Sequence, residues 1–183
     1  MRRAPGVSEP APAAPRLRVR RAVADDAGAI ARVHVRSWQA GYRGLLTGDE
    51  LDGPCEAERE AMWRELLADG GAPGVLVAEH NEGVVGFCAV AVPSRDPDAG
   101  RDVAEIAALY VDPSAWRAGV GGALMDQALS LVRAGPSVAM TLWVMSGNER
   151  AHRFYARFEF VADGARRSDR AGTEVRLRAP LAR

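Results

Sequence analysis

The chain of 183 residues contains no lysine, and all 24 of its basic residues are arginine. Its chemistry therefore excludes a lysine nucleophile or Schiff base, and arginine stays protonated, so it cannot act as a base. A Walker phosphate-binding loop also needs a lysine and is excluded. Because 24 acidic residues bring the net charge to zero, we expect neither a nucleic-acid partner nor an anionic membrane surface, which basic proteins usually bind.

Cysteine, histidine and long apolar runs are also scarce. Cys55 and Cys88 stand far apart and form neither a disulfide framework nor a metal-binding pair. The histidines, His34, His80 and His152, lack the spacing of metal ligands, so we expect no metal. No apolar run approaches the ~18 residues that span a bilayer, and the N-terminus lacks the apolar segment of a secretory signal. These absences predict a cytoplasmic protein.

The length fits one domain, since a domain takes roughly 150 residues. Residues 1–16 are rich in proline and alanine and predict a flexible arm, followed by a single domain over residues 17–183. Hydrophobic periodicity predicts strands over 17–20, 75–79, 84–92, 105–111, 138–145, 158–161 and 174–178. Mixed hairpins and strand–helix–strand units predict an α+β (mixed α/β) fold.

Four helices are predicted between these strands. The first is capped by Asp25 or Asp26 and carries Trp38; the third and fourth cover residues 120–133 and 149–157. The second helix is predicted over residues 49–67. Its apolar stripe consists of Leu51, Cys55, Met62, Trp63 and Leu66.

A glycine-rich turn follows the strand over 105–111 and opens the helix over 120–133. A helix N-terminus presents unpaired N–H groups and partial positive charge, so such a turn can bind phosphate oxygens. Taken alone, glycines there indicate tight packing as readily as a ligand. A dinucleotide-binding fingerprint starting at Gly119 would need a third glycine where the chain has Leu124. Such a fingerprint also follows the first strand of its fold directly, whereas this turn follows a central strand after a five-residue connection. A nicotinamide cofactor is therefore not expected.

Two segments resemble the GNAT superfamily of acyl-CoA-dependent N-acyltransferases. Gly119 and Gly121 match the glycines of its motif A, Gln/Arg-x-x-Gly-x-Gly/Ala, although Trp116 stands at the leading position. The segment from Leu142 to Phe160 resembles motif B, with Glu159 in place of a glycine. The matching residues there are Leu142, Val144, Asn148, Ala151, Phe154, Tyr155 and Phe160. Residues 34–46 resemble the first helix of a bacterial branch, so the resemblance covers residues 17–178.

The resemblance implies a GNAT-like central sheet, mixed but mostly antiparallel, flanked by helices and splayed at the CoA site. Acetyl-CoA is the implied cosubstrate. Its pantetheine arm would lie along the strand before motif A and its pyrophosphate on the turn, with Asn148 either contacting CoA or capping the next helix. The implied cofactor-binding residues are Leu109, Tyr110, Val111, Arg117, Ala118, Gly119, Val120, Gly121, Gly122 and Asn148.

For the chemistry, the resemblance implies that Tyr155 is the general acid for the departing thiolate, which suits a hydroxyl with an ordinary pKa near 10. Glu105 is the candidate base. We expect it to share a strand face with Leu109 and Val111 and to have a raised pKa among apolar neighbours. Trp38 and Tyr42 are candidates for the wall of the acceptor pocket. Each of these residues could instead have a structural role.

The implied function is acetyl transfer from acetyl-CoA to a primary amine, with a small-molecule acceptor expected. One alternative is a non-catalytic CoA-binding or sensory domain, which the departures at Trp116 and Glu159 suggest. Another is a protein N-terminal acetyltransferase. It is weakened because Trp143 stands where the ribosomal-protein alanine acetyltransferases have a glutamate base. The family also leads us to expect a homodimer.

Overall fold

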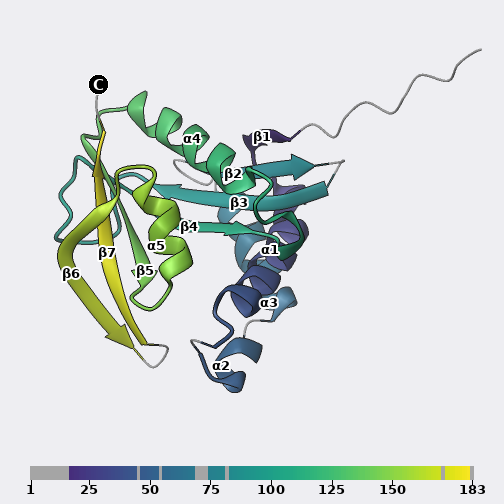
Figure 1. The fold of residues 1–183 in the computed structure, drawn as a ribbon. Helices are drawn as coiled ribbons and strands as arrows, with labels where there is room; N and C mark the ends of the chain where they lie inside the picture. Colours follow the sequence, from purple (N-terminus) through teal and green to yellow (C-terminus); the bar gives the residue numbers. More distant parts are fainter. Residues whose placement is uncertain are drawn as a thin grey trace, which may run out of the picture.

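The computed structural model describes residues 17–44, 46–53, 55–68, 74–80, 83–169 and 172–181. Within these residues, seven strands form one sheet in the order β1-β2-β3-β4-β5-β7-β6 (Figure 1). The strands are β1 (Arg18–Arg21), β2 (Gly74–His80), β3 (Gly83–Ala91), β4 (Val103–Val111), β5 (Ala139–Met145), β6 (Val161–Asp169) and β7 (Gly172–Pro180). Only β4 and β5 pair in parallel. The predicted mixed, mostly antiparallel α+β fold is confirmed. The predicted arm over residues 1–16 lies outside the described residues.

Helices cover both faces of the sheet (Figure 1). On one face α1 (Ala27–Gly41) and α3 (Glu56–Ala68) pack on β2, β3 and β4 around Ile30, Trp63 and Phe87. On the other face α4 (Val120–Arg133) and α5 (Glu149–Ala156) pack around Leu124 and Tyr155. α2 (Gly48–Asp52) is one short turn. None of the helices in the described part of the chain is long and apolar enough to cross a membrane.

The sheet opens between its two parallel strands. β4 pairs with β5 only from Val103–Ala139 to Ile106–Leu142, although β4 continues to Val111 and β5 to Met145. Beyond that point each strand pairs only with its outer neighbour, β4 with β3 and β5 with β7. The inner edges of both strands therefore face a gap, which is the splay that the resemblance implies.

A β-bulge in β4 changes which side chains share a face. Ala108 pairs with Ala89 but Ile106 pairs with Val90, so Ala107 is an extra residue in β4. Leu109 and Val111 pack on the α4 face with Ile106, which places Glu105 on the opposite face. The expectation that Glu105 shares a face with Leu109 and Val111 is therefore wrong.

The second predicted helix is wrong in its extent and its stripe. The chain leaves the helical conformation at Gly53, so α2 and α3 are separate helices. Pro54 follows in the sequence, and proline disfavours helix both at its own position and at the one before it. Of the predicted stripe only Trp63 is buried. Met62 and Leu66 are 40% and 43% exposed.

Two smaller predictions also need correction. Asp26 does not cap α1 through its side chain; its carboxylate accepts hydrogen bonds from Arg20 at 2.7 and 2.8 Å and from the N–H of Val23 at 2.8 Å. The terminal strands form a long hairpin, β6 and β7, which begins at Val161 rather than at residue 158. Phe158 and Glu159 instead close α5, where their N–H groups bond carbonyls of the last turn.

Candidate active site

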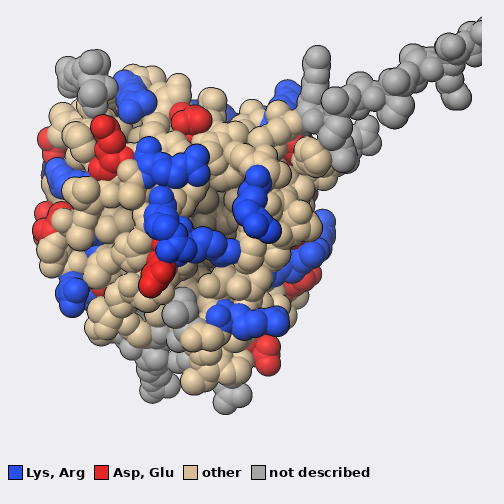
Figure 2. All heavy atoms as spheres, viewed as in Figure 1, with Lys and Arg blue, Asp and Glu red and all other residues tan. Residues whose placement is uncertain are grey.

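A cavity of about 880 Å³ lies in the gap between β4 and β5. Its walls come from the end of α1, from β4 and the turn after it, from β5 and α5, and from the β6–β7 hairpin. Every predicted site residue except Ala118 lines it. In all, six arginines and two glutamates line it, so the cavity is basic although the whole chain is neutral. Figure 2 shows basic side chains gathered around a hollow on this face of the molecule.

The glycine-rich turn forms one end of the cavity. Gly119 precedes α4 with φ 83°, and Arg117 is also left-handed with φ 64°. Glycine adopts this conformation without a steric cost, whereas arginine does so only where its surroundings hold it. The N–H groups of the first turn of α4, from Val120 to Gly122, have no acceptor within the helix. They give this end of the cavity a partial positive charge suited to an anion.

Trp116, the departure from motif A, brings a cation to the turn from another element. Its indole N–H donates to the carbonyl of Val111 at 2.7 Å. The guanidinium of Arg150, on α5, lies 3.7 Å from the centroid of the indole ring. Burial lowers the pKa of Arg150, but arginine remains charged. The position where motif A has glutamine or arginine thus holds a tryptophan that carries an arginine on its face.

The end of β4 is fastened by side chains. The carbonyl of Val111 accepts hydrogen bonds from the Ser37 hydroxyl at 2.8 Å and from Trp116. Both partners line the cavity, together with Leu109 and Tyr110. Asn148 caps α5, because its Oδ1 accepts from the N–H of Ala151 at 3.1 Å. The capping interpretation of Asn148 is confirmed, while its contact with CoA stays a prediction.

All three tyrosines of the chain line the cavity. Tyr155 is 8% exposed. Burial raises its pKa, and the nearby Cys88 and Tyr42 raise it further. Burial also raises the pKa of Tyr42 and of Tyr110, and the charge of Glu174 adds to both shifts. A hydrogen bond between the Tyr110 and Tyr42 hydroxyls also affects both pKa values. The raised pKa values keep all three hydroxyls protonated at neutral pH.

Glu105 lines the cavity but is engaged in an ion pair with Arg95. Its residue is 3% exposed. Its Oε1 accepts from Arg95 Nη2 at 2.7 Å, and its Oε2 accepts from the Arg95 N–H at 2.8 Å and from Ser94 Oγ at 3.2 Å. Although burial acts to raise the pKa of Glu105, the bonds and charge of Arg95 lower it overall. The predicted rise in this pKa is therefore wrong.

Trp38 and Tyr42 lie together at the end of α1, with ring centroids 4.4 Å apart. Tyr42 follows the last residue of the helix, and both rings line the cavity. Their place beside the gap agrees with a wall for a second substrate. That role stays a prediction.

Sequence reasoning missed several residues that line this cavity. The missed residues are Arg95, Arg150, Trp143, Arg167 and Glu174. The sequence drew attention to Trp143 only because the ribosomal-protein alanine acetyltransferases have a glutamate base at that position. Two of them meet partners that are distant in sequence: Trp143 donates to Asp96 Oδ2 at 2.7 Å, and Arg150 lies over Trp116. Within the described residues, no group of three or more histidine, cysteine, aspartate or glutamate side chains could hold a metal ion.

Comparisons with known proteins agree with this geometry. The model of the acetyltransferase (GNAT) family matches residues 33–160. A Mycobacterium tuberculosis protein described as a probable N-acetyltransferase is 30% identical over 150 residues, 81% of this chain and 82% of the relative. An uncharacterized N-acetyltransferase of Archaeoglobus fulgidus is 33% identical over 140 residues, 76% of this chain and 90% of the relative.

A solved structure has the same fold. The PaiA N-acetyltransferase of Thermoplasma acidophilum, in complex with coenzyme A, superposes with a TM-score of 0.73. The alignment covers 88% of this chain and 98% of the other at 16% identity. At that identity the likeness concerns the fold alone.

Proposed function

Because the chain belongs to the acetyltransferase (GNAT) family, we propose that it transfers the acetyl group of acetyl-CoA directly to the primary amine of a small molecule. The observation that carries this proposal is the continuous cavity that joins the glycine-rich turn to Tyr155, Glu105 and the aromatic pair Trp38–Tyr42. An anion site and a site for a second substrate thus open into one space at the gap in the sheet.

The CoA half of this cavity is formed by Leu109–Val111, by Trp116, Arg117 and the turn to Gly122, and by Asn148, Arg150 and Tyr155. The pyrophosphate binds the N–H groups at the start of α4. The pantetheine arm runs along the inner edge of β4, which β5 leaves unpaired after Ile106, as an added strand would. The arginines around the turn complement the charge of the phosphates.

Tyr155 is the proposed general acid. The amine nitrogen attacks the thioester carbonyl carbon, the carbon–sulfur bond breaks, and the Tyr155 hydroxyl gives its proton to the departing thiolate. A backbone N–H near Leu109–Val111 polarises the carbonyl oxygen. The raised pKa of Tyr155 supports this role, because the hydroxyl is protonated at the start of each cycle.

Glu105 is the proposed base, which takes the proton that the amine loses. Arg95 lowers its pKa, so the carboxylate is ionised at neutral pH and can accept a hydrogen bond from the amine. The same ion pair makes it a weaker base than a carboxylate among apolar neighbours would be. Trp38 and Tyr42 form part of the acceptor half of the cavity, which also contains Arg95, Glu105, Trp143, Arg167 and Glu174.

The test uses the full chain, acetyl-CoA and a broad panel of primary amines. Native mass spectrometry measures binding of acetyl-CoA, thiol release measures turnover, and mass spectrometry identifies the acetylated product. We expect binding and acetylation of at least one small amine. Binding without transfer to any amine would support the non-catalytic CoA-binding domain, and transfer only to peptide N-termini would overturn the small-molecule acceptor.

A further inference from the structure

The charged side chains of the acceptor half form two ion pairs, and the two pairs differ. In the first, both oxygens of Glu105 and both Nε and Nη2 of Arg95 are used. In the second, Arg167 Nε donates to Glu174 Oε2 at 2.6 Å. Among the described residues, neither member makes another hydrogen bond to a side chain. One carboxylate oxygen and both Nη groups of this pair thus remain available to a ligand.

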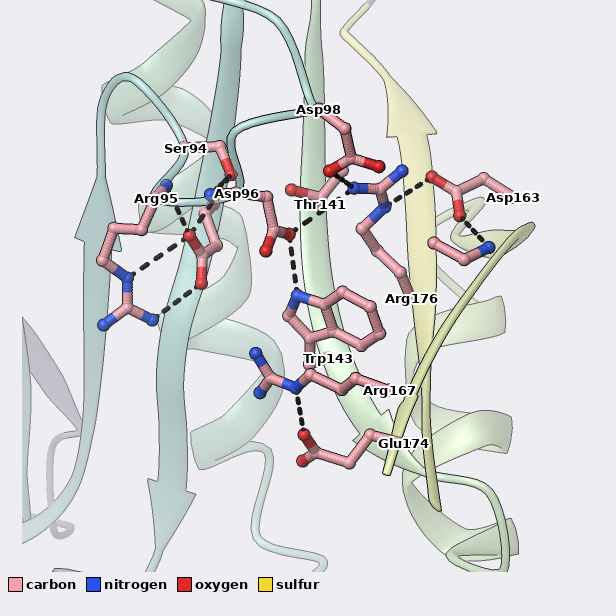
Figure 3. Close-up of polar contacts among 12 residues, drawn as sticks. Ser94, Arg95, Asp96, Asp98, Thr141, Trp143, Asp163, Arg167, Glu174 and Arg176 are labelled. Carbon is pink, nitrogen blue, oxygen red and sulfur yellow. Dashed lines mark hydrogen bonds and ion pairs between the residues drawn. The ribbon is translucent and has the colours of Figure 1, made fainter. Parts of the chain in front are cut away.

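Trp143 holds the guanidinium of Arg167 in place (Figure 3). The centre of that guanidinium lies 4.4 Å from the centroid of the indole ring. The indole N–H is fixed by Asp96, as described above. Guanidinium and indole planes attract each other through cation–π contact, so Arg167 is oriented before any ligand binds, although its side chain is 56% exposed.

A second arginine lies beside Trp143, but its charge is neutralised within the protein. Arg176 lies beside Trp143 and is buried, with ion pairs to Asp163 at 2.8 Å and to Asp98 at 2.7 Å. Aspartates of the protein therefore neutralise its charge, and Arg176 is not available to bind a ligand in the cavity. Arg167 has a single acidic partner among the described residues. A ligand group with negative charge would accordingly meet Arg167 rather than Arg176.

Glu174 is the acidic member of this second pair. It lines the cavity with Tyr42 and Tyr110, and its charge acts on both hydroxyls. Its side chain is 25% exposed. The pair thus presents a negative group toward the tyrosines, with a positive group directly beside it.

On the proposed function, we infer that the acceptor carries a carboxylate next to its reactive amine and is an amino acid with an apolar or aromatic side chain. Arg167 binds the carboxylate through its Nη groups, which suit a planar two-oxygen partner. Glu174 attracts the ammonium form of the acceptor. That ammonium loses one proton to solvent before the neutral amine attacks, and Glu105 takes the proton that the attacking amine then releases. Adjacent opposite charges match a short zwitterion, whereas a diamine would place its second cation against Arg167. Trp38, Tyr42 and Trp143 give the side chain an aromatic wall.

The test compares matched acceptors that differ only in the carboxylate. Phenylalanine is set against phenethylamine and phenylalaninamide, and leucine against isoamylamine and leucinamide, with acetyl-CoA as donor. We expect kcat/KM for each amino acid to exceed that of its amine and amide by at least about tenfold, as the loss of one charged contact implies. Amines or amides acetylated as well as the acids would overturn the inference and leave the proposed function intact.

Variants assign the preference to residues. Arg167→Met removes the charge and keeps an unbranched side chain, and it should reduce the acid-to-amine ratio of kcat/KM by at least about tenfold. Arg166→Met is the matched control: Arg166 neighbours Arg167 in β6 and does not line the cavity, so the ratio should stay as in the wild type. An unchanged ratio in Arg167→Met would overturn the inference. Absence of turnover with every acceptor would overturn the proposed function as well.

Discussion

The CoA half and the acceptor half of the cavity are built in different ways. Most of the CoA half comes from one stretch of chain, the end of β4 and the turn into α4, with α5 added. Its proposed anion site consists mainly of backbone N–H groups at the start of α4. The acceptor half draws single side chains from α1, β4, β5, β6, β7 and the loop before β4. A backbone site can be recognised from glycine spacing, whereas a side-chain site exists only after distant segments meet.

Tyr155 belongs to the CoA half of the cavity, and its replacement should give the largest effect. Tyr155→Phe removes the proposed proton donor and keeps the ring in the core. We expect kcat to fall by about 100-fold, the lower end for loss of a general acid and about 2.7 kcal/mol of barrier. KM for acetyl-CoA should change little. Steady-state kinetics with the best acceptor from the amine panel measures both constants.

The pH profile provides an independent check of the same residue. Burial raises the pKa of Tyr155 above its usual value, so the acid stays protonated in alkaline buffer, and kcat should not decline between about pH 7 and 9 on its account. Tyr42→Phe, on the acceptor side, serves as the control and should act mainly on KM for the amine. A Tyr155→Phe enzyme with wild-type kcat would show that another group protonates the thiolate.

The face of the sheet covered by α1 and α3 should be sensitive to acid, because it holds a buried histidine. His34 on α1 stacks on Tyr110, with ring centroids 4.8 Å apart, and its Nδ1 accepts from Trp63 Nε1 at 3.4 Å. Burial lowers the pKa of His34 from 6.5 to about 4, and Arg59 contributes. Between these values the unfolded chain binds a proton that the folded protein does not. Stability is therefore complete above pH 6.5 and falls as the pH drops towards 4.

At pH 5 the free energy of unfolding should be lower by about 2 kcal/mol than at neutral pH. The estimate multiplies the distance of pH 5 from the unfolded pKa of 6.5 by about 1.36 kcal/mol per pH unit. Urea unfolding at about pH 7.5 and pH 5 measures the loss. His34→Asn keeps an acceptor for Trp63 and should remove most of that difference. His80→Asn, at the half-buried end of β2, is the control and should retain it. Equal pH dependence in the wild type and His34→Asn would contradict the assignment.

The same contrast explains what the sequence could predict. The bounds of α4 follow from its glycines and apolar period, and Gly119, Asn148 and Tyr155 fall into one cavity as the motif spacing implies. The bulge at Ala107 lies beside Ala108, between Ile106 and Leu109, and no residue type there marks it. The partner of Glu105 is Arg95, in the loop before the strand. Nothing local distinguishes that arginine from the others.

The next effect tests the backbone character of the CoA half. Gly119 has φ 83° and Gly164, in β6, has φ 97°; an added Cβ would meet nothing within 4 Å at either position. Alanine at either site should cost about 1 kcal/mol of stability, since the left-handed conformation is strained for any residue with a Cβ. Only Gly119→Ala should also weaken acetyl-CoA binding, by about five- to tenfold, because it shifts the N–H groups of the turn.

Calorimetry with acetyl-CoA and thermal unfolding measure the two effects separately. Gly164 does not line the cavity, so Gly164→Ala measures the cost of backbone strain alone. If both variants bound acetyl-CoA as the wild type does, the conformation of Gly119 would not be part of the binding site. If both bound it more weakly, the loss would come from global destabilisation.

The smallest expected effect concerns Arg150, a charged side chain of the CoA half. Arg150→Ala removes the guanidinium from the face of Trp116 and should raise KM for acetyl-CoA about three- to fivefold, which corresponds to an exposed cationic contact of about 0.5–1 kcal/mol. Arg153→Ala is the comparison. Arg153 is already paired with Glu149 at 3.1 Å, so its removal should change KM by less than about twofold.

Salt and a shortened donor substrate then identify what Arg150 binds. A contact with phosphate should weaken as salt rises, because the charges lie near solvent. If Arg150 contacts the 3′-phosphate of CoA, the difference between wild type and Arg150→Ala should disappear with acetyl-dephospho-CoA. If it contacts the pyrophosphate, as its place on Trp116 at the motif A position favours, the difference should persist. An Arg150→Ala enzyme equal to the wild type with both donors would leave the CoA half dependent on its backbone alone.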